Sequence, residues 1–136
     1  MKDRNYGTRW HTGNPGQHAN EWLRLRFSKI NKIKGVIVST GEFASDFPRG
    51  IEVLISSDCP EEFNYKEDLK DYRQVFYANP WKGRTEYTEK GYPYFGSQSE
   101  VGIYFNETEQ VQCLVIKQLA VSPKFDWSVA EVFFYE

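Results

Sequence analysis

The chain is poor in cysteine, in net charge and in long apolar runs, and each scarcity excludes a class of protein. Two cysteines among 136 residues are too few for the disulfide framework of a small secreted scaffold. The net charge is −2, with both signs mixed along the chain. This balance argues against a nucleic acid or an anionic membrane as partner, because either needs a basic patch. Apolar runs such as 132–135 fall far short of the ~20 residues of a transmembrane helix.

The two cysteines are expected to be free thiols. Cys113 lies in the apolar run 111–116 and has the character of a small buried hydrophobe, whereas Cys59 lies in the turn-like stretch 57–60. A disulfide between them stays open as the alternative. No signal peptide is visible, so either the domain is cytoplasmic or it belongs to a longer protein whose targeting segments lie elsewhere.

Signals for catalysis are also scarce. The chain has no G-x-S-x-G elbow, P-loop or G-x-G-x-x-G motif. His11 and His18 lack the spacing of a helix-borne zinc pair. The acidic pair at 61–62 lies in a polar stretch, which is typical of a solvated surface rather than of a glycosidase dyad. We therefore expect a protein that is not an enzyme.

Aromatic residues are abundant, and the chain is patterned for strands. Rings make up 17% of the residues, and wide rings fill the gap between the sheets of a sandwich. Leu23, Leu25 and Phe27 share one face of the alternating segment 21–27. Further strands are predicted at 33–40, 51–56, 72–77, 101–105, 111–117 and 128–135.

The segments between these strands are turn-rich. Residues 3–20 are predicted to be loop-like and 28–32 to form a polar turn, while 61–99 is the least readable part. No helix of three turns is predicted. Several short strands separated by Gly/Pro turns indicate a sandwich or a barrel, and the chain length fits one domain.

Four segments, in order, resemble the discoidin, or factor V/VIII C-type, family, which includes bacterial galactose-binding-like carbohydrate-binding modules. Asp3-Arg-Asn-Tyr-Gly-Thr-Arg-Trp10 is similar to its D-x-[DN]-x-x-T-R-W loop, and Glu21-Trp-Leu-Arg-Leu-Arg-Phe27 to the W-[LI]-x-[VI]-D-L strand that follows. Phe47-Pro-Arg-Gly-Ile-Glu-Val-Leu-Ile-Ser-Ser-Asp58 resembles Y-P-R-x-Y-x-V-x-x-S-x-D. Trp127-Ser-Val-Ala-Glu-Val-Phe-Phe-Tyr135 resembles the closing W-S-[IL]-x-E-[LI]-x-[VF]-[YF] strand.

The resemblance implies an all-β fold, a jelly-roll β-sandwich of about eight antiparallel strands. It would cover residues 1–136 as a single domain, with an atypical insertion at about 59–99. The family's S-D-G-x-x-W hairpin is replaced here by Ser57-Asp-Cys-Pro60, and only two residues precede the Asp3 loop, where the family has a strand.

The implied function is non-catalytic glycan binding by an accessory domain of a larger glycan-active or membrane-associated protein, with an extracellular or periplasmic location. In sugar-binding members the Asp loop holds a structural Ca²⁺, an ion that prefers oxygen ligands. The ligands carried over to this chain are Asp3, Asn5, Thr8 and Glu131. The alternative is an Asx-turn without metal and a Glu131 paired to a base. We favour calcium because an unpaired carboxylate in an apolar strand is costly.

Sugar recognition needs flat aromatic faces for the C–H side of a pyranose and planar donors and acceptors for its hydroxyls. In the family this site lies on loops at one end of the sandwich. The candidates here are Trp81, Arg49, Trp127 and His11, with His18, Tyr92 and Tyr94 as weaker ones. Trp81 is the first choice because its flanks, 79–83, indicate an exposed turn. Trp127 equally fits packing against the core, and Arg49 equally fits an ion pair with Asp46.

The alternative function is a protein-interaction or structural accessory domain without a sugar site. The insertion carries aromatic residues that would suit a protein-docking surface: Tyr77, Trp81, Tyr87, Tyr92, Tyr94 and Phe95. Rings packed on the sandwich would weaken the sugar site, whereas an exposed patch would favour a protein partner.

Overall fold

The computed structural model describes residues 10–11, 20–41, 46–62, 69–79, 86–87, 93–94, 100–120 and 127–136. The strands are β1 (Trp10–His11), β2 (Glu21–Ser39), β3 (Ile51–Ser56), β4 (Arg73–Ala78), β5 (Glu86–Tyr87), β6 (Pro93–Tyr94), β7 (Glu100–Gln118), β8 (Ser128–Val129) and β9 (Glu131–Tyr135). A short 3₁₀ turn, η2 (Leu69–Asp71), precedes β4. All strand pairs among these residues are antiparallel, which confirms the all-β antiparallel fold.

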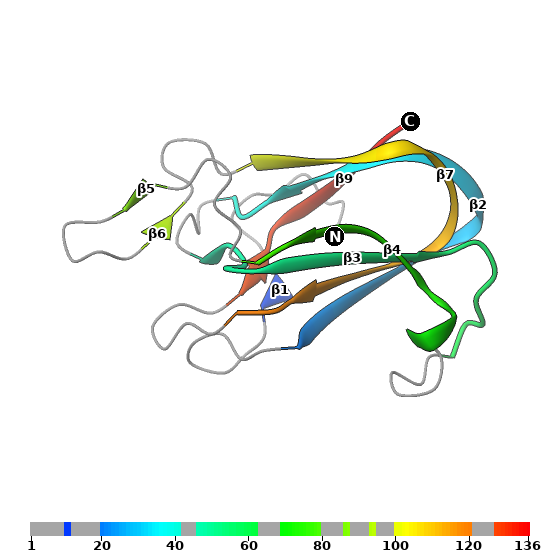
Figure 1. Cartoon of the computed structure of the whole chain (residues 1–136), viewed down its shortest axis with the longest axis horizontal. Helices are drawn as coiled ribbons and strands as arrows, with labels where there is room; N and C mark the ends of the chain where they lie inside the picture. Colours follow the sequence, from blue (N-terminus) through cyan, green and yellow to red (C-terminus); the bar gives the residue numbers. More distant parts are fainter. Residues whose placement is uncertain are drawn as a thin grey trace.

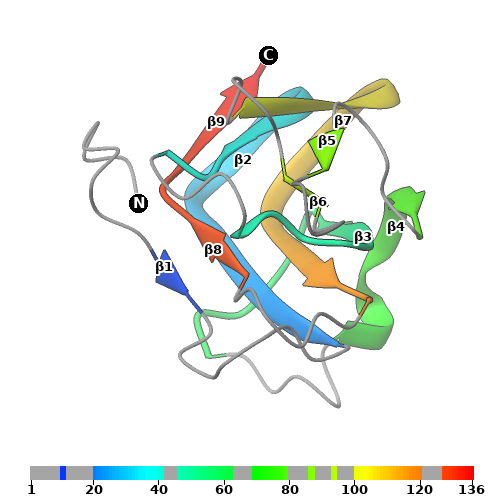
Figure 2. The same cartoon turned by 90° about the vertical axis from the view of Figure 1, so that its left-hand side faces the viewer.

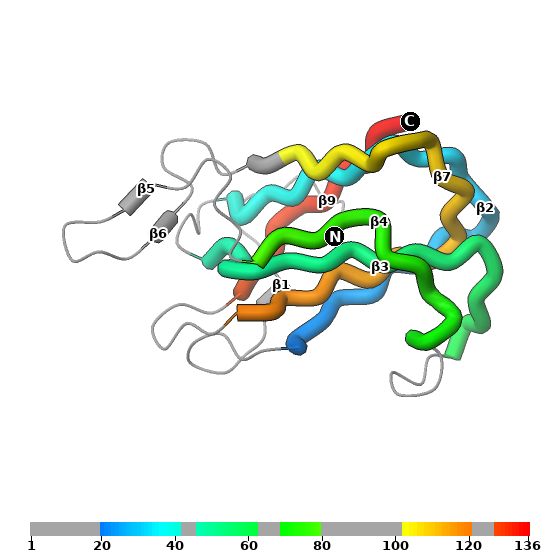
Figure 3. The backbone as a smooth tube through the Cα atoms, viewed as in Figure 1, coloured from blue at the N-terminus to red at the C-terminus, as the bar shows by residue number. Residues whose placement is uncertain are grey.

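The main sheet has five strands in the order β4-β3-β7-β2-β9, and it bends over itself. Its two longest strands, β2 and β7, have 19 residues each and pair along most of their length. Figure 1 shows both strands curving together at one end of the molecule, and the tube in Figure 3 traces the same bend. One layer therefore holds β9 with the second half of β2 and the first half of β7. The other layer holds β3 and β4 with the remaining halves, and Figure 2 shows the two layers from the side.

Two irregularities of register accompany the bend. The pairing of β2 with β7 shifts between Arg26 and Asn31 and again between Ile33 and Gly35. At the first shift β2 has three more residues than β7 between the paired positions, and at the second shift β7 has three more than β2. An odd number of extra residues bends a strand and reverses which side chains face inward. Accordingly Ile33 is buried before the second shift, and Val36 and Val38 are buried after it. The prediction of a turn at 28–32 was wrong, because a bent strand exposes the same run of polar side chains as a turn would.

The core lies between the two layers. Val36 and Val38 of one layer and Val53 and Ile116 of the other belong to the same buried cluster, whose burial is the main favourable contribution to folding. Its members are Leu23, Ile33, Val36, Val38, Phe47, Ile51, Val53, Ile55, Ile103, Phe105, Val111, Leu114, Ile116, Trp127, Val129 and Val132. Over the described residues, no helix is long and apolar enough to cross a membrane.

The two cysteines form a disulfide, so the expectation of free thiols was wrong. Their Cα atoms lie 6.2 Å apart although the residues are 54 positions apart in the chain. Ser56, the last residue of β3, pairs with Cys113 of β7. That pairing carries Cys59, three residues further on, back over β7. Sequence patterns did not show this proximity, because it depends on which strands are neighbours in the sheet.

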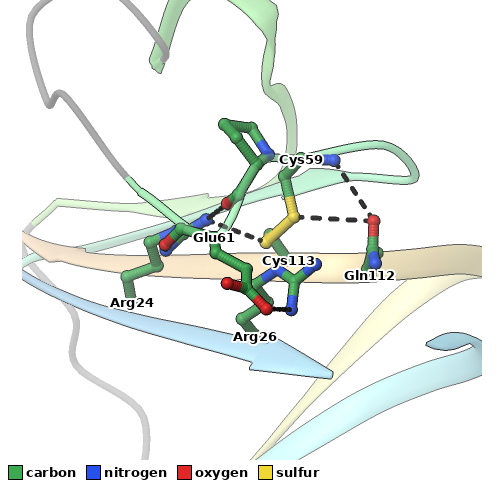
Figure 4. A network of polar contacts seen from close by, with 7 residues as sticks. Arg24, Arg26, Cys59, Glu61, Gln112 and Cys113 are labelled. Atoms are coloured by element: carbon green, nitrogen blue, oxygen red, sulfur yellow. Dashed lines mark hydrogen bonds and ion pairs between the residues drawn. A yellow bond between two sulfur atoms is a disulfide. The ribbon is translucent and has the colours of Figure 1, made fainter. Parts of the chain in front are cut away.

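Polar contacts reinforce the disulfide (Figure 4). The Arg24 guanidinium donates to the carbonyl oxygens of Pro60 at 2.5 Å and Glu61 at 3.1 Å, and it lies 3.3 Å from the Cys113 Sγ. The Cys59 amide donates to the side-chain oxygen of Gln112 at 3.2 Å. The segment that follows β3 is thereby fastened to both β2 and β7.

Candidate functional site

Four separate segments meet around residues 127–131, at the end of the sandwich opposite the bend. β1 pairs with β8, and Figure 2 shows the two short strands side by side. The Ser128 Oγ donates to the Asp46 Oδ2 at 2.9 Å. The Ala130 amide donates to the Ser39 carbonyl oxygen at 2.8 Å. We call this region, made of β1, 39–41, 46–50 and 127–131, the loop end.

Glu131 is the most unusual residue of the loop end. It opens β9 opposite Ser39, and its side chain is completely buried. Neither of its carboxylate oxygens has a hydrogen-bond partner among the described residues. A buried carboxylate in this state is costly unless a cation compensates it. The side chain therefore fits a hard cation such as Ca²⁺.

The remaining predicted calcium ligands, Asp3, Asn5 and Thr8, lie outside the described residues. The described part of the chain contains no group of three or more His, Cys, Asp or Glu side chains able to hold a metal. The backbone of β1 places Trp10 opposite Val129, two residues before Glu131. Trp10, the first described residue after the three other candidates, is thus paired with β8.

Arg49 is held within its own loop. Only 9% of it is exposed, and its guanidinium donates to the Phe47 carbonyl oxygen at 2.6 Å. The same group lies 4.3 Å from the centre of the Phe47 ring, a cation–π distance. Burial lowers the pKa of Arg49 to about 10, and the nearby charge of Asp46 partly opposes this shift. The guanidinium is still charged at neutral pH, and Phe47 and Asp46, the two neighbours named here, both belong to its own loop.

Trp127 belongs to the core. None of its surface is exposed, and it lies in the same cluster as Phe47 and Val129. Its ring therefore offers no open face to a sugar. This placement matches the packing role that the sequence left open, and it brings the indole beneath the loop end.

The other predicted sugar contacts are only partly described. His11 pairs through its backbone with Ser128 at the loop end, and Tyr94 pairs with Glu86 in the β5–β6 ribbon. Trp81, His18 and Tyr92 lie outside the described residues. One end of the sandwich thus holds Arg49, Trp127 and Glu131 with their side chains. The backbone of His11 lies at the same end.

Sequence reasoning missed two features that the structure shows. One is the buried hydrogen bond between Ser128 and Asp46, which joins residues 82 positions apart. The other is an exposed contact between the rings of Tyr104 and Tyr135. The signal for an exposed Tyr104 was present, because it alternates with the apolar residues Ile103 and Phe105 on one strand.

No protein-family model matches the chain, and no curated protein matches it in sequence. Solved structures do match. The first and second family 32 carbohydrate-binding module domains of Clostridium perfringens ZmpB are 23% identical with a TM-score of 0.65, over 98% of this chain and 30% of that longer chain. Chitosan-binding module 2 of a Paenibacillus sp. IK-5 chitosanase/glucanase, in complex with chitotriose, is 13% identical with a TM-score of 0.67. The coverage there is 98% of this chain and 82% of that one.

A third match is the family 32 module of Clostridium perfringens NanJ in complex with galactose. It is 14% identical with a TM-score of 0.65, over 98% of this chain and 80% of that one. At such identities the likeness establishes the fold. The chain has the β-sandwich fold of these modules, the jelly-roll sandwich that the four sequence segments predicted.

Proposed function

We propose that this chain is a non-catalytic carbohydrate-binding module that holds a glycan at its loop end. The observation that carries the proposal is the fold itself, which is shared over 98% of the chain with modules whose structures contain galactose or chitotriose. Proteins with this one fold thus bind chemically different sugars. The likeness supports the class of ligand, a glycan, and leaves the individual sugar to be identified by binding.

Trp81 is the proposed stacking residue. Its turn-rich neighbours favour an exposed indole, and a flat aromatic face is what the C–H side of a pyranose requires. His11 is proposed as a hydrogen-bonding partner, since β1 lies within the loop end. We assign Arg49 and Trp127 positioning roles, because one is bound to Phe47 and the other is enclosed by the core.

Calcium is proposed as a structural ion at the loop end, held by Glu131 with Asp3, Asn5 and Thr8. The buried carboxylate of Glu131 supports the ion, since its oxygens lack hydrogen-bond partners among the described residues. When bound, the ion neutralises that charge and ties the N-terminal segment to the start of β9. This role is structural and needs no contact between calcium and the sugar.

An extracellular or periplasmic location is proposed for the domain, as an accessory part of a larger glycan-active or membrane-associated protein. The disulfide between Cys59 and Cys113 supports this, because disulfides persist in oxidising compartments and are rare in the cytosol. A tethered module of this kind raises the local concentration of its parent protein near a glycan surface.

A glycan array tests the proposal directly. The wild-type chain is expected to bind a restricted set of glycans, and Trp81→Ala to lose that signal. Tyr77→Ala is the matched control, since Tyr77 is 56% exposed on β4. Absence of any array signal from folded wild-type protein would contradict the proposal and favour the protein-interaction alternative. Equal loss of signal in both variants would contradict the role of Trp81.

A further inference from the structure

Two exposed tyrosines meet across the outer face of the sheet, away from the loop end. Tyr104 of β7 and Tyr135 of β9 are both paired with Gly35, which lies on β2 between them. Their rings are 5.9 Å apart at an angle of 87°, and the two residues are 61% and 50% exposed. Exposed rings set edge to face present two flat surfaces that form a corner.

Two glycines leave room for the paired rings. Gly35 leaves the central strand without a side chain between the two tyrosines, and a Cβ there would lie 2.4 Å from the Ile103 carbonyl oxygen. A Cβ on Gly102 would lie 2.8 Å from ring atoms of Tyr104. The Tyr104 ring therefore lies over the backbone of Gly102, while the residue as a whole stays 61% exposed. A ring that packs over a glycine is held in position by its contact with the backbone. We call the two exposed rings of Tyr104 and Tyr135 the platform.

Polar side chains surround the platform. A pocket of about 320 Å³ is lined by the two tyrosines and Phe105 together with four polar residues, Lys34, Asn106, Glu107 and Thr108. This size is at the small end of the range for ligand sites, as expected for one sugar ring rather than for a protein segment. An ammonium, an amide, a carboxylate and a hydroxyl supply donors and acceptors to ring hydroxyls. The opposite charges of Lys34 and Glu107 favour a neutral ligand.

We propose that this tyrosine platform, Tyr104 and Tyr135 with their four polar neighbours, is a second binding site, which takes one neutral pyranose residue of a glycan. Tyr135 lies four residues along β9 from Glu131, about 13 Å in an extended strand. The platform therefore shares no residue with the loop end and does not depend on the site proposed there. Two sites on one small domain would let a single glycan chain or two neighbouring chains be held together, with the gain in avidity that linkage gives.

Titration of the ¹⁵N-labelled wild-type chain with galactose and with cellotriose tests the platform and the loop end separately. These two neutral probes differ in the configuration at C4, and cellotriose is also longer, with three linked glucose rings. Gly35, Gly102 and Asn106 report on the platform, and Gly41 and Gly50 on the loop end. The platform amides are expected to shift in a saturable manner with at least one probe.

Variants decide which side chains are responsible. Tyr104→Ala is expected to weaken binding at the platform about tenfold, the scale of one lost aromatic contact. Gly102→Ala keeps the ring and displaces it, so it is expected to weaken the same binding while the unfolding midpoint stays unchanged. Tyr77→Ala, on another strand, is the control and should leave the platform shifts intact.

The outcomes separate the two proposed sites. Shifts confined to Gly41 and Gly50 would overturn the platform and leave the loop end standing. Shifts confined to the platform would support it and count against the loop end. No shift with either probe would overturn the platform. A dimer of the wild-type chain in sedimentation, dissolved by Tyr104→Ala, would also overturn it, because the tyrosines would then join two copies.

Discussion

Glu131 lies directly opposite Ser39 in the register of β9 against β2, and both side chains are completely buried. The Ser39 Oγ accepts a hydrogen bond from the Gly41 amide at 3.0 Å. The oxygens of Glu131 have no such partner among the described residues. A carboxyl group is thus buried without a hydrogen-bond partner among the described residues, and a bound cation would compensate its charge.

Calcium is expected to stabilise the wild-type chain through this carboxylate. At a calcium concentration 100 times the Kd, the free energy of unfolding should rise by about 2.7 kcal/mol, and EDTA should reverse the change. Glu131→Gln should remove the response to calcium. In EDTA this variant should be at least as stable as wild type, because the buried charge is gone.

Thermal unfolding with calcium and with EDTA measures both effects, and Glu62→Gln on the exposed segment after β3 is the control. Equal melting temperatures of wild type in calcium and in EDTA would contradict the metal site. A calcium response retained by Glu131→Gln would contradict the role of this residue.

The disulfide is expected to contribute strongly to stability. It closes a loop of 54 residues, for which loop-closure entropy gives about 4 kcal/mol. The double variant Cys59→Ala/Cys113→Ala should therefore have a free energy of unfolding that is lower by about 4 kcal/mol. It should unfold at a lower urea concentration than wild type. Reductant should lower the midpoint of wild type and leave that of the double variant unchanged, and a wild-type midpoint insensitive to reductant would rule out the bond.

Arg49→Met is expected to lower the free energy of unfolding by about 1–2 kcal/mol at pH 8, through loss of the cation–π contact and the bond to Phe47. The difference should depend on pH. The pKa of Arg49 is about 10 in the folded chain, below its ordinary value of 12.5. The folded chain therefore releases this proton first, and rising pH above about 10 stabilises wild type relative to the variant. Urea unfolding at pH 8 and pH 11 measures the difference in the free energy of unfolding between wild type and Arg49→Met. A smaller difference at pH 11 than at pH 8 would contradict the burial of the charge.

Trp127→Ala should destabilise the chain by about 3–5 kcal/mol, because a completely buried ring leaves a large cavity. Tyr77→Ala should change the free energy of unfolding by less than about 0.5 kcal/mol, as exposed substitutions do. Urea unfolding of both variants measures this contrast. An unchanged midpoint for Trp127→Ala, combined with lost glycan binding, would place the ring at the surface and return it to the sugar site.

Local patterns predicted individual strands well and the connections between them poorly. The strand at 51–56 was predicted to the residue, because three β-branched side chains alternate between clear turn signals. The strands predicted at 21–27 and 33–40 are halves of β2, and those at 101–105 and 111–117 are halves of β7. The polar residues between the halves lie on the outside of the bend, which no local pattern distinguishes from a turn. The strand predicted at 128–135 is interrupted at Ala130, whose amide bonds to Ser39 instead.

The site residues divide in the same way, into those that a local pattern reveals and those that depend on which strands are neighbours. Glu131 was singled out by the resemblance of 127–135 to the family's closing strand, and its place in an apolar strand, which is visible in sequence, favoured the calcium interpretation. The pairing of Cys59 with Cys113, and the meeting of Tyr104 with Tyr135, depend on sheet order. A sequence gives such contacts between distant residues only when the neighbouring strands are already known.

Calorimetric titration with the strongest glycan from the array tests the central claim, sugar recognition without catalysis at the loop end, most directly. Wild type should bind with a Kd in the micromolar to millimolar range, on the order of 4–8 kcal/mol of binding free energy, and the glycan should be recovered intact. Trp81→Ala should bind at least about tenfold more weakly, and Tyr77→Ala should match wild type. Binding heat unaffected by Trp81→Ala, or a glycan cleaved during the titration, would contradict the account.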